Sequence, residues 1–321
     1  MLALLPQAII DGILLGGIYL TVSMGFSLAY GVLHVIDFAV GDWIMLGAFV
    51  GLTFTQWFHL DPLLSLPVVF AVFAAVGWML QPLLQHVLSG SRGRPVLMAL
   101  VFTFGLALAF RGSALTVFGI FTHSLDTVLS QGSWHFSRGS FFLTVPLIRL
   151  AGLVYALAVM LGLTYLLKKT DFGLAIRAVA QNKEAAGLMG VDLKKTDFGL
   201  AVRAVAQHKE AAGLMGVDIK RTSGAVYGIY VGISAMTGVF IGAIVSLNAG
   251  MGPDLALFAF FVVVLAGMGY LAGVPWASFL LGLVQSFFLI YLNPSYVLLA
   301  LFTILYVILL ISPTGLFRRG V

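Results

Sequence analysis

Few side chains in this sequence could do chemistry, and the first of them are carboxylates set among apolar residues. Asp11 lies inside one apolar stretch, and Asp37 and Asp42 lie in or beside the next. A carboxylate at the middle of a bilayer costs about 2.5–3.5 kcal/mol on insertion scales, so each of them should face protein or water. One interpretation is that they line, with Tyr19, the path of a zwitterionic substrate and contact its ammonium group. The alternative is that Asp42 lies at a membrane interface and that Asp11 and Asp37 are neutral or hydrogen-bonded packing residues.

Catalytic and metal chemistry have little support in the sequence. There is no cysteine, which excludes disulfides, thiolate zinc sites and thiol nucleophiles. The six histidines are scattered, and the phosphate-binding pattern GxxxxGK followed by Ser or Thr is absent. We therefore expect no enzyme activity, no metal and no cofactor. Energy for any transport must come from a separate ATPase subunit or from an ion gradient.

The elements that must position these residues are membrane-spanning helices. Of the 321 residues, 61% are hydrophobic and 9% are charged, whereas a soluble domain carries about 25% charged residues. About 20 apolar residues cross a bilayer core as a helix, so the sequence predicts an all-α transmembrane bundle of about eight or nine helices. Glycines are dense within the spans, which predicts close helix packing. The predicted spans are 8–30, 36–57, 63–88, 95–119, 145–167, 222–247, 256–274, 276–292 and 295–312, with breaks or re-entrant turns expected near 31–42 and 270–278.

More than half of the charged residues lie in one segment, 168–221. Lys and Arg beside spans mark the cytoplasmic side, so this segment is predicted to be cytoplasmic and to separate two groups of transmembrane helices, 1–167 and 222–321. The connection 120–144 then falls outside, where it could form a strand pair or a surface helix. The basic residues flank apolar spans, so nucleic acid is not an expected partner. Arg111, in the fourth span, is expected near an interface by snorkelling.

The charged segment contains nearly the same 26 residues twice, at 168–193 and 194–219. Thr-Asp near the start of each copy and the Ala-rich run after it predict a short helix. Such a helix could lie on the membrane surface, pack on its own bundle or enter the groove of a partner. The copies differ at Ile176/Val202, Asn182/His208 and Leu193/Ile219, and each carries a Glu-Ala-Ala-x-x-x-Gly motif, with its Glu at 184 or 210.

In its cytoplasmic setting, this motif resembles the coupling loop of ABC-importer permeases. The stretch that begins at Lys169 resembles the corresponding segment of the branched-chain amino-acid (LivH-type) permease family. The resemblance covers nearly the whole chain except one copy of the repeat. The other similar stretches are Gly17–Leu20, Tyr30–Leu33, Asp37–Asp42, Met45–Ala48, Arg94–Leu97, Thr103–Leu106, Phe258–Gly269 and Pro313–Phe317.

The resemblance implies a permease subunit of an ABC importer in a bacterial or archaeal cytoplasmic (inner) membrane. It would form half of a translocation path for branched-chain or related amino acids. The implied partners are ABC ATPase subunits, a second permease subunit that is identical or homologous, a periplasmic or extracellular substrate-binding protein, and membrane lipid. The motif helix would dock in a cleft of the ATPase. The coupling residues implied are Glu184, Ala185, Ala186, Gly190 and Arg177 in the first copy, and Glu210, Ala211, Ala212, Gly216 and Arg203 in the second.

Three departures from the family pattern leave alternatives open. Asp37 and Val40 stand where the family usually has Asn and His, and Asp11 stands at a usual Asn position. The substrate could therefore differ, and amide or urea permeases are close relatives. An ion-coupled secondary transporter or channel, with Asp11 and Asp37 as ion sites, and a membrane scaffold without transport are the other functions to weigh.

The third departure is the doubled segment. It is either a recent in-frame duplication or an assembly artefact that a cytoplasmic loop tolerates, or it is a double coupling element with both copies contacting ATPase. Removing one copy of 26 residues from 321 leaves 295, a usual length for such a permease.

Overall fold

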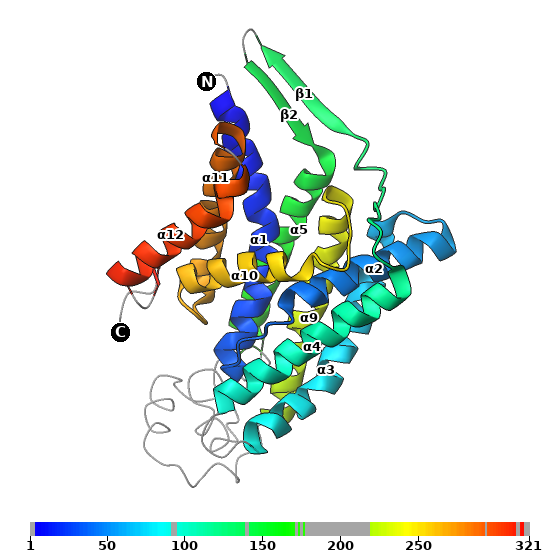
Figure 1. Ribbon diagram of the computed structural model, residues 1–321, viewed down its shortest axis with the longest axis vertical. Coiled ribbons are helices and arrows are strands. Elements are labelled where there is room, and N and C mark those ends of the chain that lie inside the picture. The colour runs from blue at the N-terminus through cyan, green and yellow to red at the C-terminus, as the bar shows by residue number, and fades with distance from the viewer. Residues whose placement is uncertain are drawn as a thin grey trace.

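The computed structural model of this chain describes residues 4–90, 95–138, 141–170, 173, 176, 219–292, 294–312 and 315–317. Across these residues the chain forms nine α-helices and one β-hairpin, which confirms the predicted all-α bundle (Figure 1). The coupling residues predicted in the repeat lie outside the described residues. The helices are α1 (Leu5–Leu33), α2 (Val40–Phe58), α3 (Leu66–Gly90), α4 (Pro95–Phe118), α5 (Leu147–Lys169), α9 (Ile219–Ile244), α10 (Gly252–Ala266), α11 (Val274–Tyr291) and α12 (Val297–Ile311).

Seven of the described helical segments are long and apolar enough to cross a membrane. The two helices outside this set are α2, whose first turn carries an acidic residue, and α10. The stretch predicted as a span over 256–274 forms α10, which has 15 residues and therefore rises about 22 Å, less than the hydrocarbon thickness of about 30 Å. Helix α10 crosses the middle of the bundle, and α2 is buried in it over the residues between Val40 and Leu52 (Figure 1).

The breaks expected near 31–42 and 270–278 are present. Helix α1 ends at His34, which adopts the left-handed conformation (φ 54°) while its N–H donates to the carbonyl of Tyr30. Residues 34–39 then lead into α2 without helix. Helix α10 ends at Gly267, with φ of 93°, a conformation that favours glycine. A short 3₁₀ turn (Leu271–Gly273) then leads into α11. His34 is exposed and Gly267 is buried, so the second interruption places a helix end inside the bundle.

The connection 120–144 contains a hairpin of two antiparallel strands, β1 (Ser133–Arg138) and β2 (Phe141–Pro146). This confirms one of the two predicted possibilities. Strand β2 continues directly into α5, and the hairpin lies at the same end of the molecule as the N-terminus (Figure 1). The first residues of α9 lie at the opposite end. The two sides of the bundle that the charge pattern predicted are therefore held at opposite ends of the fold.

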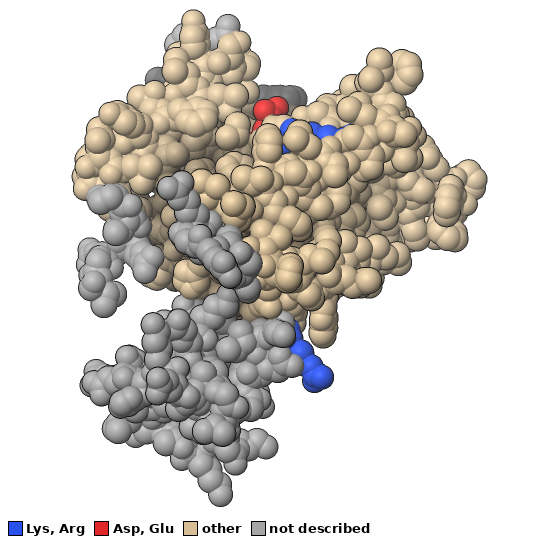
Figure 2. Space-filling view, turned by 60° about the horizontal axis from the view of Figure 1, so that its bottom comes forward, with Lys and Arg blue, Asp and Glu red and all other residues tan. Residues whose placement is uncertain are grey.

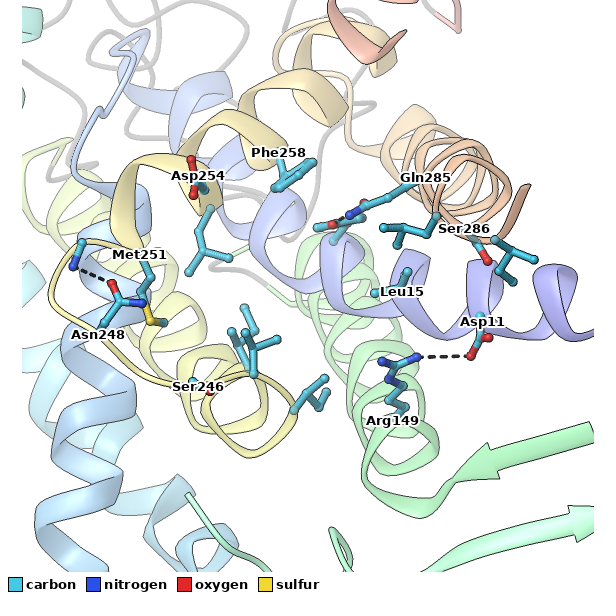
Figure 3. A pocket seen from close by; sticks show the side chains of 18 residues that line it. Asp11, Leu15, Arg149, Ser246, Asn248, Met251, Asp254, Phe258, Gln285 and Ser286 are labelled. Atoms are coloured by element: carbon cyan, nitrogen blue, oxygen red, sulfur yellow. Dashed lines mark hydrogen bonds and ion pairs between the residues drawn. The ribbon is translucent and has the colours of Figure 1, made fainter. Parts of the chain in front are cut away.

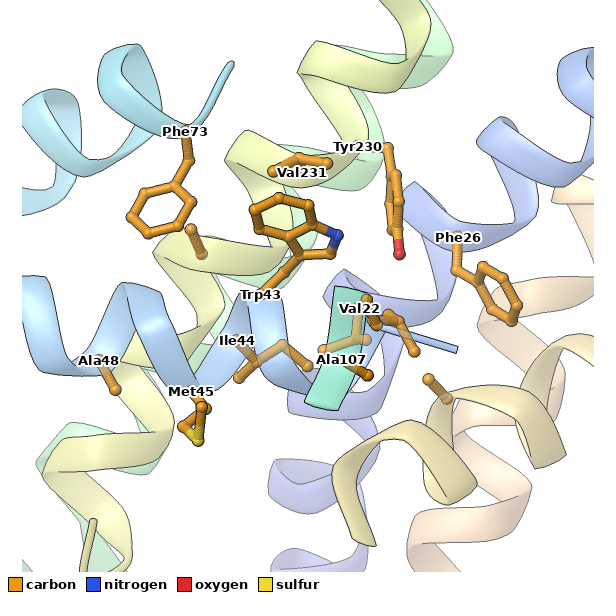
Figure 4. Packing of buried hydrophobic residues seen from close by; sticks show 14 of the residues in the cluster. Val22, Phe26, Trp43, Ile44, Met45, Ala48, Phe73, Ala107, Tyr230 and Val231 are labelled. Carbon is orange, nitrogen blue, oxygen red and sulfur yellow. The ribbon is translucent and has the colours of Figure 1, made fainter. Parts of the chain in front are cut away.

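The centre of the bundle is built from α1 and α9. In their apolar windows 72% of α1 and 78% of α9 are buried, against 11% for α12. Helix α9 packs on α2 and α3, and around this contact Trp43 of α2 is enclosed by Tyr230 and Val231 of α9 and by Phe73 of α3 (Figure 4). Many large apolar side chains are exposed on the described helices, and the face in Figure 2 shows few charged side chains. A lipid environment suits such a surface.

Close approach between helices depends on glycines, as predicted. At the crossing of α2 and α9, a Cβ built on Gly238 would overlap the carbonyl oxygen of Ile44, and one built on Gly47 would overlap the carbonyl oxygen of Ala235. A second contact of this kind joins α1 to α11, where Gly12 lies against the backbone of Leu283. At Gly238 and Gly47 the nearest atoms are all backbone atoms, so a side chain could be accommodated there only by moving a helix.

We expect Gly238→Ala to lower the free energy of unfolding by about 1–3 kcal/mol, because the added methyl group overpacks the α2–α9 crossing. Gly105→Ala is the matched control, since a Cβ there meets nothing within 4 Å. That change should be neutral or stabilising, because Ala favours a helix over Gly by about 1 kcal/mol. Thermal unfolding of both variants in detergent measures the difference. Equal stability of the two would contradict the packing role of Gly238.

Candidate functional site

A pocket of about 480 Å³ opens in the half of the bundle nearer to the hairpin. It lies between the first half of α1, the start of α5, the end of α9, the start of α10 and the second half of α11 (Figure 3). Two of the predicted path residues, Asp11 and Tyr19, line it. The full lining is Asp11, Leu15, Tyr19, Arg149, Ile241, Ile244, Val245, Ser246, Asn248, Gly250, Met251, Asp254, Leu255, Phe258, Gln285, Ser286, Leu289 and Ile290.

One wall of the pocket carries an ion pair. Nη1 of Arg149 lies 3.2 Å from Oδ1 of Asp11, and both side chains are partly exposed, at 31% and 19%. The other carboxylate oxygen of Asp11 accepts from Nε2 of Gln7 at 2.9 Å. The amide of Gln7 is in turn fixed by Thr144 of β2, donating to its carbonyl and accepting from its N–H, each at 2.9 Å. The hairpin therefore anchors this wall and sets the start of α5, which carries Arg149.

A second polar group lies deeper along α1. The hydroxyl of Tyr19 donates a short hydrogen bond to the side-chain oxygen of Gln285 on α11. The ring of Tyr19 stacks on Phe258 of α10, with ring centroids 5.2 Å apart. Next to Gln285, Ser286 donates to the carbonyl of Ala8 at 2.7 Å. Three helices are thus joined at this side of the pocket.

Much of the remaining lining is aliphatic, including Leu15, Ile241, Ile244, Leu289 and Ile290. Ser246, Asn248 and Asp254 add polar groups at the loop before α10 and at its first turn. A cavity with an ion pair at one wall and aliphatic groups beside it suits a small ligand that has a polar head and an apolar body.

Asn248, in the loop before α10, and Asp254, in the first turn of α10, are two further polar residues at the pocket. The side-chain oxygen of Asn248 accepts from the N–H of Gly250 at 2.9 Å, which is a turn interaction. Asp254 is exposed in the first turn of α10, where a carboxylate is stabilised by the partial positive charge of the helix N-terminus. Both also line the pocket, which their place in the sequence did not reveal.

Asp37 lies away from this pocket, in the break between α1 and α2. It is 3% exposed. Its Oδ2 accepts from the hydroxyls of Tyr227 and Tyr230 at 2.8 and 3.2 Å and from Nε1 of Trp43 at 3.3 Å. Its Oδ1 accepts from the N–H of Ala39 at 2.8 Å. Four donors therefore hold this carboxylate, and they join the break to α2 and α9. These contacts are the ones expected if Asp37 is a hydrogen-bonded packing residue, the second of the two interpretations of this carboxylate.

Asp42 also lies outside the pocket lining. Its side chain is completely buried and pairs with Arg111 of α4, with Nε at 2.8 Å from Oδ1 and Nη2 at 3.2 Å from Oδ2. Arg111 therefore has a buried carboxylate as its partner, and its place near a membrane interface stays a prediction. The carboxylate also touches Gly252, the first residue of α10, so it binds α2, α4 and α10 together. A role for Asp37 and Asp42 in the substrate path stays a prediction.

Sequence reasoning missed Arg149, Gln7 and Gln285 as parts of the site. A signal existed for two of them, since Arg149 and Gln285 are polar residues inside predicted spans and such residues tend to face the interior of the bundle. Within the described ranges no group of three or more His, Asp or Glu could hold a metal ion.

Comparisons with known proteins match this chain to membrane transport permeases. The family model described as branched-chain amino acid transport system, permease component, matches residues 8–197 and 192–312. The chain is similar to the high-affinity branched-chain amino acid transport system permease protein BraD of Pseudomonas aeruginosa, at 25% identity over 323 residues, which cover 98% of this chain and 95% of that protein. No solved structure matches the chain.

Two further relatives carry similar names. One is the high-affinity branched-chain amino acid transport permease LivH of Escherichia coli K12, 24% identical over 325 residues, which cover 98% of this chain and 95% of that protein. The other is a probable branched-chain amino acid transport permease, LivH, of Methanocaldococcus jannaschii, 29% identical over 195 residues, which cover 58% of this chain and 59% of that protein. The family match spans nearly the whole chain and the fold is a multi-pass helical bundle, so this protein belongs to the family of branched-chain amino acid transport permease components.

Proposed function

We propose that this chain is the transmembrane permease subunit of an ABC importer and forms half of a translocation path for branched-chain or related amino acids. The observation that carries the proposal is the family match over 8–197 and 192–312. Support comes from the pocket, in which an ion pair stands beside an aliphatic wall. The ion-coupled alternative is not favoured, because the relatives reported above are named as permease components of transport systems.

In this importer, separate ABC ATPase subunits would hydrolyse ATP. The chain has no phosphate-binding loop of its own. The remaining proposed partners are a second permease subunit, identical or homologous, and a substrate-binding protein. The second permease subunit is required because one chain forms only half of the translocation path.

We place the protein in a bacterial or archaeal cytoplasmic membrane with segment 168–221 on the cytoplasmic side. The Lys and Arg content of this segment supports that orientation. The N-terminus and the hairpin lie at the end of the bundle away from the start of α9 (Figure 1). They would therefore face outward, and the pocket, which is nearer to them, would lie in the outer half of the path.

We assign roles in transport to residues that line the pocket and to residues of the repeated motif. Asp11 and Tyr19 are proposed to line the path, because both line the pocket. Glu184 and Glu210, each within a Glu-Ala-Ala motif, are proposed to couple the permease to the ATPase, with Arg177 and Arg203 beside them. Helix α9 begins at Ile219, the last residue of the second copy of the repeat, and lies at the centre of the bundle. A movement of the docked segment would thus reach the centre of the bundle along the chain.

We expect the double change Glu184→Ala and Glu210→Ala to lower ATP-dependent uptake of labelled leucine by roughly tenfold or more, as the loss of a buried charged contact at a partner interface predicts. The measurement is uptake into proteoliposomes that contain the full importer. Each single change is the control, since either copy could supply the contact. If the double variant assembles with the ATPase and retains full uptake, the coupling role is wrong.

Deleting residues 168–193 should leave uptake and complex assembly unchanged. The two family-matched stretches overlap at 192–197, around the junction between the copies, which is consistent with one copy being additional. A cytoplasmic loop also tolerates length changes at small entropic cost. Co-purification of the ATPase with the shortened chain, together with uptake, measures the effect. Loss of either one would show that both copies are required.

A further inference from the structure

We propose that the Asp11–Arg149 ion pair binds the charged head of an α-amino acid, with Arg149 taking the carboxylate and Asp11 the ammonium group. This rests on the proposed function and deepens it by assigning the recognition of the substrate's charges to two residues of this chain. The pair lies on one wall of a pocket of about 480 Å³ (Figure 3).

The spacing of the two charges matches that of an α-amino acid head. In an α-amino acid the carboxylate and the ammonium group are attached to the same carbon, so their charged atoms lie about 3 Å apart, close to the length of a charge-assisted hydrogen bond. Asp11 and Arg149 lie side by side with 3.2 Å between their charged atoms. A zwitterion placed antiparallel to this pair therefore meets an opposite charge at each end.

Both side chains have hydrogen-bonding capacity left for such a ligand. A guanidinium has five N–H donors in a fork that matches a carboxylate, and the contact with Asp11 is made through Nη1 alone. Each oxygen of Asp11 accepts one donor in the structure, from Arg149 or from Gln7, whereas a carboxylate offers about four acceptor positions. Both side chains are partly exposed.

The pair is also held in place before any ligand arrives. Gln7 bonds Asp11 and both backbone polar groups of Thr144, which fixes the carboxylate from the side of the hairpin. Arg149 is positioned because it lies in the first turn of α5, directly after β2. Recognition groups locked by supporting hydrogen bonds lose less entropy when they bind.

The rest of the pocket distinguishes the substrate class. Beside the pair, Leu15 of α1 and Leu289 and Ile290 of α11 line the cavity, and Ile241 and Ile244 of α9 add to its aliphatic lining. A branched aliphatic side chain attached to the bound head would meet these groups, while a polar side chain would lose hydrogen bonds to water there. The chemistry therefore fits an α-amino acid with an aliphatic side chain.

The test is competition for labelled leucine on the full chain in nanodiscs. The competitors are 3-methylbutylamine, which is leucine without its carboxylate, and 4-methylpentanoate, which is leucine without its ammonium group. In the unchanged protein each should compete roughly tenfold or more less well than leucine, as expected for the loss of a hydrogen bond between charged groups.

The variants should change these preferences selectively. Arg149→Gln should abolish the advantage of leucine over the amine, and Asp11→Asn should abolish its advantage over the acid. Arg149→Lys keeps the positive charge and should restore part of the preference for a carboxylate. Asp61→Asn is the matched control, because Asp61 is a hydrogen-bonded carboxylate outside the pocket lining. It should leave the order of the three ligands unchanged.

The outcomes separate this inference from the proposed function. If the unchanged protein binds leucine and both variants keep its order of ligands, the pair has a structural role, the inference is overturned and the transport function stands. If both preferences fall equally in each variant, the two residues do not recognise separate charges and the assignment is likewise overturned. If the unchanged protein does not bind leucine while the assembled importer takes up another solute, both the inference and the proposed substrate class are wrong.

Discussion

Replacing Asp42 with Ala should lower the free energy of unfolding by about 3–5 kcal/mol, because it leaves the charge of Arg111 without its partner inside the protein. The carboxylate of Asp42 is completely buried and accepts two hydrogen bonds from the guanidinium of Arg111, from Nε at 2.8 Å and from Nη2 at 3.2 Å. Arg111 belongs to α4, an outer helix whose apolar window is 22% buried. Without Asp42, an unpaired guanidinium would adjoin a hydrocarbon environment.

The effect can be measured by thermal or denaturant unfolding of the purified protein in detergent. The second variant is the double change Asp42→Leu and Arg111→Leu, which removes both charges and keeps apolar volume. Replacing a buried ion pair by packed apolar residues is often neutral or stabilising, so the double variant should recover most of the loss. A double variant as unstable as Asp42→Ala would show that the loss comes from packing against Gly252 and not from the unpaired charge.

Replacing Asp37 with Ala should be similarly severe, at about 3 kcal/mol or more. Three side-chain donors and one backbone N–H converge on its carboxylate, and the side-chain donors are the hydroxyls of Tyr227 and Tyr230 and Nε1 of Trp43. A buried donor left without an acceptor costs about 1–3 kcal/mol. Because Asp37 precedes α2 while both tyrosines belong to α9, its removal should also loosen the contact between these two helices.

Tyr227→Phe is the matched comparison, since it removes one donor and keeps the ring. It should cost about 1.5–3 kcal/mol, the range for a hydrogen bond to a charged group. Adding Tyr227→Phe and Tyr230→Phe to Asp37→Ala should cost less than the sum of the separate changes, because the three residues share one network. Unfolding measurements on the whole set give the coupling energy. Strict additivity would contradict a shared network.

The fold was largely predictable because its main determinants are local. Apolar stretches of about 20 residues predicted the helices, and clusters of Gly and polar residues predicted the breaks after Leu33 and after Ala266. The number of membrane crossings was harder to predict. The apolar sequence of the predicted span continues to residue 274, but α10 ends before Gly267, whose φ is positive, and is too short to cross a bilayer. That ending depends on a backbone conformation that hydropathy does not report.

The site was less predictable than the fold. Asp11 and Tyr19 were identified as path residues and both line the pocket, whereas Asp37 and Asp42, chosen on the same grounds, bind protein donors instead. All three carboxylates have the same signature in sequence, a charge within apolar residues. What separates them is the partner that each one meets. Asp11 meets Arg149 at the wall of an open pocket, and Asp42 meets Arg111 in a closed contact.

The sequence by itself determined the class of protein, the helices, the charged segment and its repeat, and the resemblance to a permease family. These follow from hydrophobicity, charge and motif order along the chain. The tertiary structure alone decided which helices lie at the centre and which polar residues meet, such as Asp11 and Arg149, 138 positions apart, or Asp37 and Tyr227, 190 positions apart. The physical reason is that lipid and protein interior are equally apolar, so hydrophobicity does not say which face of a membrane helix points inward. That choice is made by close packing at glycines and by pairing of the few polar groups.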